Sequence, residues 1–60
     1  MISFGAKVRE AREKASIGLG EMENRTGMPW RYLMGIEDGE IFPSVETYRK
    51  IYEAMGVSYD

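Results

Sequence analysis

The sequence contains no cysteine and no histidine, which removes two common means of holding a very small fold together. Disulfide bonds are excluded, and a zinc site would have to be built from carboxylates alone, which structural zinc sites rarely use. No apolar run approaches the about 20 residues that span a bilayer, and no signal-peptide pattern opens the chain. We therefore expect one domain over residues 1–60 that holds by packing alone, with no cofactor, no membrane association and a cytoplasmic location.

The same absences argue against an enzyme. Without histidine or cysteine the chain has no obvious pairing of nucleophile and base, and it has no glycine-rich loop of the kind that cradles phosphate. Sixty residues also provide too little bulk for a sheltered pocket. We expect a non-enzymatic protein with no small-molecule substrate.

Positive charge is scarce and unevenly spread. The net charge is −2, whereas proteins that bind the phosphate backbone normally carry a basic surface. Residues 1–31 hold six Lys or Arg against four Asp or Glu, and residues 32–60 hold two against six. A nucleic-acid-binding surface is therefore expected in the first half of the chain.

What the sequence does contain is a regular succession of helix signals. Apolar residues recur at helical spacing, and the period-two alternation of strands is absent. The expected helices cover about residues 3–15, 19–26, 29–38 and 44–55. The expected N-caps are Ser3 and Ser44, and the expected stops are Gly27, Gly39 and Gly56. Pro29 fits the first turn of the third helix, where its missing N–H is not needed.

Apolar stripes on the first and last helices predict the core. The stripes comprise Phe4, Val8, Ala11 and Ala15 in the first helix and Val45, Tyr48, Ile51, Tyr52 and Met55 in the last. Val57 is expected to pack back against the core. The opposite side of the first helix carries the charges expected on a solvated face, namely Lys7, Arg9, Glu10, Glu13 and Lys14. These stripes predict an all-α protein.

A set of residues spread over nearly the whole chain carries a family resemblance. They are Val8-Arg9-Glu10-Ala11-Arg12, Gly27, Tyr32-Leu33, Ile36-Glu37, Gly39, Pro43-Ser44-Val45-Glu46-Thr47 and Met55-Gly56-Val57-Ser58. In this order and at these spacings they resemble the Cro/repressor type of helix-turn-helix domain, also called the XRE family. The resemblance implies a compact, lambda-repressor-like bundle of four to five short helices with a helix-turn-helix at about residues 18–39. It also implies a DNA-binding transcriptional regulator of repressor type that works as a homodimer.

Two structural expectations follow from this resemblance. Gly27 would lie in the tight link between the two helices, although a simple helix stop explains a glycine there equally well. Arg12 would reach Glu37 and tie the third helix to the first, through the planar guanidinium that suits a carboxylate. The alternative for Arg12 and Glu37 is ordinary solvation.

The side chains expected to face DNA carry few hydrogen-bonding groups. By resemblance they are Leu19, Pro29, Trp30, Arg31, Met34 and Gly35, with the third helix in the major groove. Arg31 has the chemistry to pair with guanine, and solvation is its alternative. Trp30 can contact thymine methyls or sugar, a protein partner, or the core by partial burial. Asp38 and Glu40 in the following loop would repel phosphate.

An interaction with protein is the alternative function. The segment from Leu19 to Glu37 is also similar to the cytoplasmic helix-turn-helix of RodZ, a bacterial cytoskeletal protein whose domain binds an actin homologue rather than DNA. Exposed Leu19, Trp30 and Met34 would form an apolar anchor for such a partner.

Other residues on and near the second helix complicate the interpretation. Lys7, Lys14 and Arg25 are candidate phosphate contacts. Glu23 stands where the family usually has a small residue, so it must reach solvent or pair with Arg25 or Arg31. Thr26 replaces a common aliphatic core residue, which predicts a weakly anchored second helix.

Overall fold

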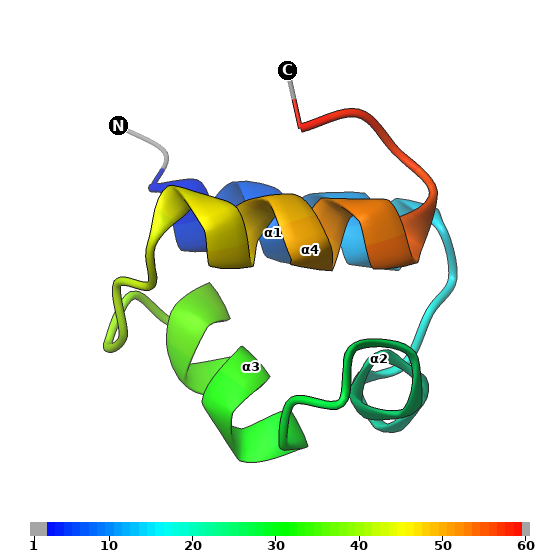
Figure 1. Cartoon of the computed structure of the whole chain (residues 1–60), viewed down its shortest axis with the longest axis horizontal. Helices are drawn as coiled ribbons and strands as arrows, with labels where there is room; N and C mark the ends of the chain where they lie inside the picture. Colours follow the sequence, from blue (N-terminus) through cyan, green and yellow to red (C-terminus); the bar gives the residue numbers. More distant parts are fainter. Residues whose placement is uncertain (1–2, 60) are drawn as a thin grey trace.

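Four α-helices account for the regular structure of residues 3–59, which is the part of the chain that the computed structural model describes. They are α1 (Phe4–Lys14), α2 (Leu19–Thr26), α3 (Trp30–Glu37) and α4 (Val45–Met55) (Figure 1). No strand occurs in this range. The prediction of an all-α bundle is confirmed, and each expected helix end lies within one residue of the observed one.

The helix ends follow from local chemistry. The Ser3 hydroxyl accepts a hydrogen bond from the Ala6 N–H at 3.1 Å, and Ser44 accepts one from Thr47 at 3.3 Å, as expected of N-caps. Gly27 and Gly56 end α2 and α4 in the left-handed conformation, both at φ 78°, which only glycine adopts without strain. Pro29 differs from its prediction, because it is the extended residue before α3 and not part of the first turn.

Two layers make up the fold. Helices α1 and α4 lie side by side, and α2 and α3 pack beneath them, while the segment after α4 runs along the other side (Figure 1). Helix α3 contacts α1 and α2, and α2 also contacts α4. Each of the four helices therefore packs against two others.

A single apolar cluster lies between the layers. Its buried members are Val8, Ile17, Met22, Leu33, Ile36, Tyr48, Ile51 and Met55. They come from all four helices and from the α1–α2 link. Detachment of any one helix would therefore expose core side chains to water. Burial in a low-polarity environment raises the pKa of the Tyr48 hydroxyl above its ordinary value.

Four residues predicted to be apolar core are not. Phe4 is 62% exposed and Val45 is 55% exposed, because both are the first residues of helices that overhang the end of the core. Ala15 is exposed just after α1 ends. Val57 is 42% exposed, so the chain does not return this side chain to the core.

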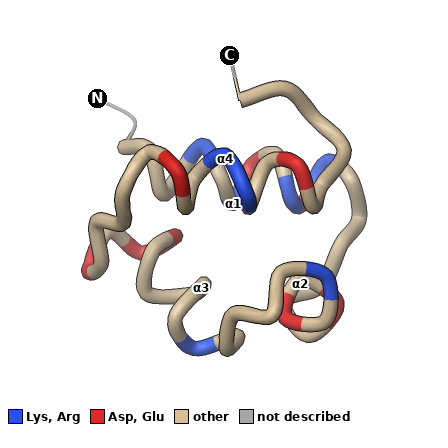
Figure 2. The backbone as a smooth tube through the Cα atoms, in the orientation of Figure 1, with Lys and Arg blue, Asp and Glu red and all other residues tan. Residues whose placement is uncertain are grey.

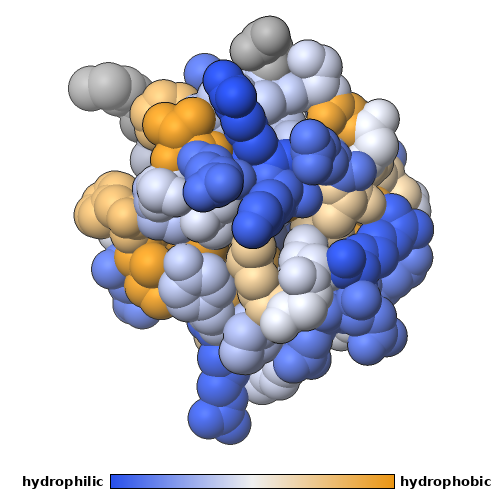
Figure 3. Space-filling model, viewed as in Figure 1, coloured by the Kyte–Doolittle hydropathy of each residue, from blue (hydrophilic) through white to orange (hydrophobic). Residues whose placement is uncertain are grey.

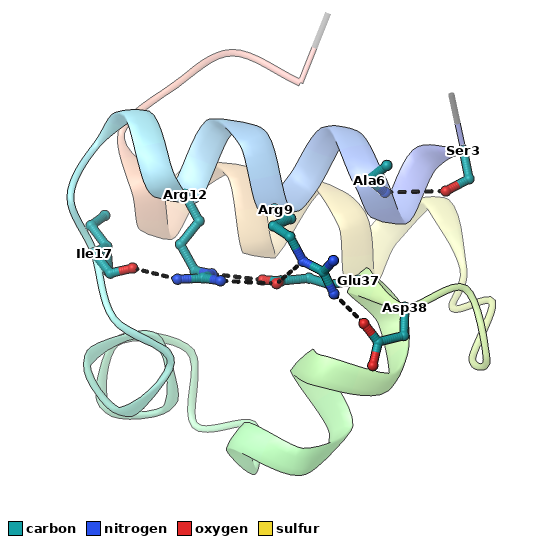
Figure 4. Close-up of polar contacts among 7 residues, drawn as sticks. All are labelled: Ser3, Ala6, Arg9, Arg12, Ile17, Glu37 and Asp38. Carbon is teal, nitrogen blue, oxygen red and sulfur yellow. Dashed lines mark hydrogen bonds and ion pairs between the residues drawn. The ribbon is translucent and has the colours of Figure 1, made fainter. Parts of the chain in front are cut away.

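A charge cluster joins α1 to the end of α3. The Glu37 side chain is 3% exposed, and Arg12 donates to it through Nε at 2.7 Å and through Nη2 at 3.0 Å (Figure 4). Arg12 also donates to the Ile17 carbonyl at 2.8 Å, so one guanidinium holds α1, α3 and the α1–α2 link. These bonds raise the pKa of Arg12 above its ordinary value. The predicted Arg12–Glu37 pair is confirmed.

Arg9 belongs to the same cluster, contrary to the prediction that it is merely solvated. Its Nε donates to Glu37 at 3.3 Å, and its Nη2 contacts Asp38 (Figure 4). Two guanidinium groups thus balance two carboxylates at the C-terminus of α3, where the helix dipole disfavours negative charge. Among residues 3–59, no buried side-chain polar atom lacks a hydrogen-bond partner.

Close approach of two backbones accompanies this cluster. Gly5 is buried in α1, and a Cβ atom at this position would lie 2.0 Å from the Ile36 carbonyl oxygen and 2.9 Å from that of Glu37. Only glycine lets α1 reach the end of α3 at this distance.

Replacing Arg12 by alanine should lower the free energy of unfolding by about 3–5 kcal/mol, because it leaves the buried Glu37 carboxylate without its main partner. Chemical denaturation measures the loss. Arg9→Ala is the matched control and should cost clearly less, since the Arg9 side chain is 41% exposed. A loss below about half a kcal/mol for Arg12→Ala would contradict the structural role of the pair.

Gly5→Ala should cost about 1–3 kcal/mol despite the better helix propensity of alanine, because the added methyl group forces α1 away from the α3 backbone. Gly20→Ala in α2 is the control: no atom lies within 4 Å of the added Cβ, so this change should be neutral or stabilise the fold. Thermal unfolding of both variants checks the difference. Equal effects would show that the Gly5 contact is unimportant.

Candidate nucleic-acid interface

Helices α2 and α3 are linked by a tight turn and cross steeply. The link consists of Gly27, Met28 and Pro29. In Figure 1, α2 is seen end-on while α3 runs across the view. Gly27 donates its N–H to the Glu23 carbonyl at 2.8 Å, so it serves both as the stop of α2 and as part of the turn. This is the geometry of a helix-turn-helix, in which the first helix braces the second.

Thr26 fixes the turn through its hydroxyl group. The hydroxyl donates to the Met22 carbonyl at 2.7 Å and accepts from the Met28 N–H at 3.0 Å. Met22 is 1% exposed and Met28 packs against the core. Thr26 thus closes the end of α2 and its turn, and Met22 is the one buried residue of α2. The weak anchoring of α2 that the sequence suggested stays a prediction.

The first turn of α3 presents the solvent-facing part of this unit. Trp30 is 40% exposed and Met34, one helical turn later, is 39% exposed. Pro29 and Arg31 are exposed beside them. These four residues share one face because Leu33 and Ile36 take the opposite face into the core. The structure therefore places Pro29, Trp30, Arg31 and Met34 together, as predicted.

Arg31 rests on the neighbouring aromatic ring. Its guanidinium carbon lies 5.3 Å from the centre of the Trp30 ring, within the range of a cation–π contact. Among residues 3–59, Arg31 makes no ion pair. Its five N–H donors thus remain available to a ligand while stacking restricts the orientation of the side chain.

Two residues predicted on this surface lie elsewhere. Gly35 is buried, and a Cβ atom there would lie 2.6 Å from the Ile41 side chain, so this residue faces the loop after α3. Its carbonyl accepts the N–H groups of Glu40 and Ile41, which closes that loop. Leu19 is partly buried and packs against the core. Gly35 therefore presents no side chain to the surface, and Leu19 presents only part of its side chain.

Charged residues occur along both α2 and α3 (Figure 2), and most of them are paired internally. Glu37 and Asp38 are paired with Arg12 and Arg9, so Asp38 is not the free repulsive charge that the sequence suggested. Arg25 contacts Glu21 at 2.5 Å and donates to the Ala54 carbonyl at 2.9 Å.

The charges that remain on α2 and α3 after this pairing are Arg31 and Glu23. Glu23 is partly buried and makes no ion pair with Arg25 or Arg31 in the described chain. The surface of α2 and α3 is therefore nearly neutral, and Glu40 is an exposed acidic residue in the loop that follows the C-terminal end of α3.

The other predicted phosphate contacts do not join this surface. Lys7 and Lys14 line a hollow between α1 and the segment after α4, together with Tyr52, Ser58 and Tyr59. That segment lies on the side of the α1–α4 layer away from α2 and α3 (Figure 1). Arg25 is occupied by Glu21 and by the end of α4.

The sequence predictions missed Arg9 and Thr26. A signal existed for Arg9, which precedes Arg12 by three residues and so shares its helix face. Thr26 offered a weaker signal: a threonine before a glycine stop can hydrogen-bond to the backbone of its own helix.

Metal and membrane sites receive no support from the described residues. No three acidic side chains within residues 3–59 come together in a way that would hold a metal ion. In the same range, every helix is too short or too polar to cross a bilayer.

Comparison of this chain with protein-family models, with curated proteins and with solved structures found no match.

Proposed function

We propose that this chain is the DNA-binding domain of a transcriptional regulator of repressor type, with α3 lying in the major groove. A helix that reads DNA must project its first turn outward and be braced from behind. Helix α3 meets both conditions: Trp30 and Arg31 lie at its exposed start, while α2 and the Arg12–Glu37 pair hold its other side.

The single observation that carries the proposal is the position of Arg31. Arginine pairs bidentately with O6 and N7 of guanine, which is the commonest specific contact in the major groove. Arg9, Arg12 and Arg25 are committed to internal carboxylates, whereas Arg31 is exposed on the first turn of α3. Trp30 beneath it supplies an apolar edge for a thymine methyl group or a deoxyribose.

The low charge of the surface determines the kind of binding expected. Non-specific affinity for DNA comes mainly from phosphate neutralisation by Lys and Arg. With Arg31 as the free cation on α2 and α3, one copy should bind random DNA weakly and depend on base contacts for its affinity.

A second candidate is a protein-interaction module of the RodZ kind on the same scaffold. The observation that favours it is the exposure of Trp30 and Met34 side by side on a nearly neutral surface. Tryptophan and methionine are enriched at the centres of protein interfaces, where charged residues are depleted. Helix α3 would then be the helix that enters the partner's groove.

Titration of duplex DNA at two salt concentrations tests the proposal. If one to three phosphates are neutralised, the affinity should fall about 3-fold to 40-fold between 50 mM and 200 mM salt. Trp30 is the one tryptophan of the chain and lies on the proposed surface, so its fluorescence reports binding directly. Failure of repeated selection from a pool of random duplexes at low salt to enrich any binding sequence would favour the protein-interaction alternative.

Arg31→Ala should reduce discrimination at one base position of a duplex selected by the wild-type chain from that pool, by about 1–3 kcal/mol. Arg49→Ala is the matched control, because Arg49 also lies over an aromatic ring, 6.0 Å from the centre of Tyr59, but on α4. The control should leave base preference unchanged. Unaltered discrimination in Arg31→Ala would remove Arg31 from the reading surface.

A further inference from the structure

A surface hollow lies between α1 and the segment that follows α4, on the side of the α1–α4 layer away from α2 and α3 (Figure 1). Its volume is about 370 Å³, within the about 300–1,000 Å³ of sites that bind small molecules. Lys7, Glu10 and Lys14 line it from α1, and Tyr52 and Tyr59 line it from α4 and from the segment after α4. We call this site the tail hollow.

Positive charge gathers at the tail hollow, although the chain as a whole carries a net charge of −2. Lys7 and Lys14 stand against one acid, Glu10, and the Arg49 guanidinium lies over the Tyr59 ring, 6.0 Å from its centre. These three cations make no ion pair in the part of the chain that the structure describes. Figure 3 shows hydrophilic side chains across the middle of the α1–α4 layer. Exposed, unpaired cations gathered on an acidic protein favour an anionic ligand.

Two tyrosine rings form the α4 side of the tail hollow. Tyr52 and Tyr59 meet edge to face, with their ring centres 5.4 Å apart and their planes at 77°. Both side chains are partly buried, so the rings are held by packing while part of each faces the hollow. Fixed aromatic rings bind planar rings by stacking or edge-to-face contact. A ligand that suits this site therefore combines a planar ring with negative charge.

We propose that the tail hollow binds a free nucleoside monophosphate, with the base against the tyrosine rings and the phosphate at the basic groups. A phosphate monoester carries close to two negative charges at pH 7, which suits several cations better than a carboxylate does. Glu10 lies on the same helix face as Lys7 and Lys14, at spacings of three and four residues, and its carboxylate can accept hydrogen bonds from ribose hydroxyl groups. The inference does not rest on DNA binding.

The position of each lysine on α1 decides which one meets the phosphate. Lys7 lies near the start of the helix, where the helix dipole favours negative charge, whereas Lys14 is the last residue of the helix, where the dipole opposes it. We therefore assign the phosphate to Lys7. A phosphodiester within a nucleic-acid strand carries a single charge, so a free nucleotide suits this site better than a strand.

A heteronuclear NMR titration of the wild-type chain with AMP tests the inference. The amide signals of Lys7, Glu10, Lys14 and Tyr59 should shift together, with a dissociation constant of about 0.1–3 mM. The indole signal of Trp30, which lies on the other side of the molecule, should not move. Adenosine lacks the phosphate and ribose phosphate lacks the base, so each should bind at least tenfold more weakly than AMP.

Lys7→Gln should weaken AMP binding at least threefold, because it removes the cation assigned to the phosphate. Lys50→Gln is the matched control: Lys50 is an equally exposed lysine, but it lines a different hollow between α2 and α4 and should leave the affinity unchanged. Tyr59→Leu should weaken binding of AMP but not of ribose phosphate, since it removes a ring and no charge. Circular dichroism confirms that the three variants are folded.

Four results would overturn the inference. They are the absence of amide shifts at about 10 mM AMP, equal affinities for AMP and ribose phosphate, equal losses in Lys7→Gln and Lys50→Gln, and a shift of the Trp30 indole signal. The second and third would indicate general attraction of anions, and the fourth would indicate binding at α3. Tighter binding of a dinucleoside phosphate than of AMP would also overturn it, in favour of a strand. No duplex DNA is present, so failure here leaves the proposed function untouched.

Discussion

The pairing of buried Glu37 with Arg12 is the interaction on which the placement of α3 depends. Helix α3 has only eight residues, too few to be stable alone, and two carboxylates stand at its unfavourable C-terminal end. Arg12 and Arg9 neutralise these groups and fasten them to α1, while Gly5 allows the two backbones to approach. The orientation of the exposed first turn is therefore set at the opposite end of the same helix.

Internal ion pairs use several of the few cations of the chain. The chain has eight Lys and Arg, and three of its arginines serve the interior or the helix ends. This use removes positive charge from the α2–α3 surface, but it also neutralises Glu37, Asp38 and Glu21, which would otherwise repel phosphate. The sequence shows an acidic excess over residues 18–39, whereas the folded surface is nearly neutral, because pairing depends on positions in space and not on totals.

Helix order and helix ends were predictable because caps and glycine stops act within a few residues of the chain. The burial or exposure of residues at the helix ends was not predictable in this way. Phe4 and Val45 have the correct helical spacing for the core, yet each begins a helix that extends past its neighbours. Gly35 was assigned to the outer face because periodicity alone cannot show where the next loop returns, and the Ile41 side chain covers Gly35.

The exposure of Trp30, Arg31 and Met34 was predictable from the sequence. These residues lie on the side of α3 opposite the strongly apolar Leu33 and Ile36.

Under the proposed function, the nearly neutral surface of α2 and α3 changes what the domain must use to reach its DNA target. Removing a phosphate contact weakens binding to the specific site and to random DNA by the same factor. Both affinities fall, but the ratio of specific to random affinity is unchanged. In the proposed function, base contacts from Arg31 and Trp30 would set that ratio, and their small number would limit it for one copy. Two copies double the base contacts and add their free energies, which random DNA cannot match. In the proposed function, a domain of this charge therefore depends on additional base contacts for the affinity that the missing positive charge does not supply.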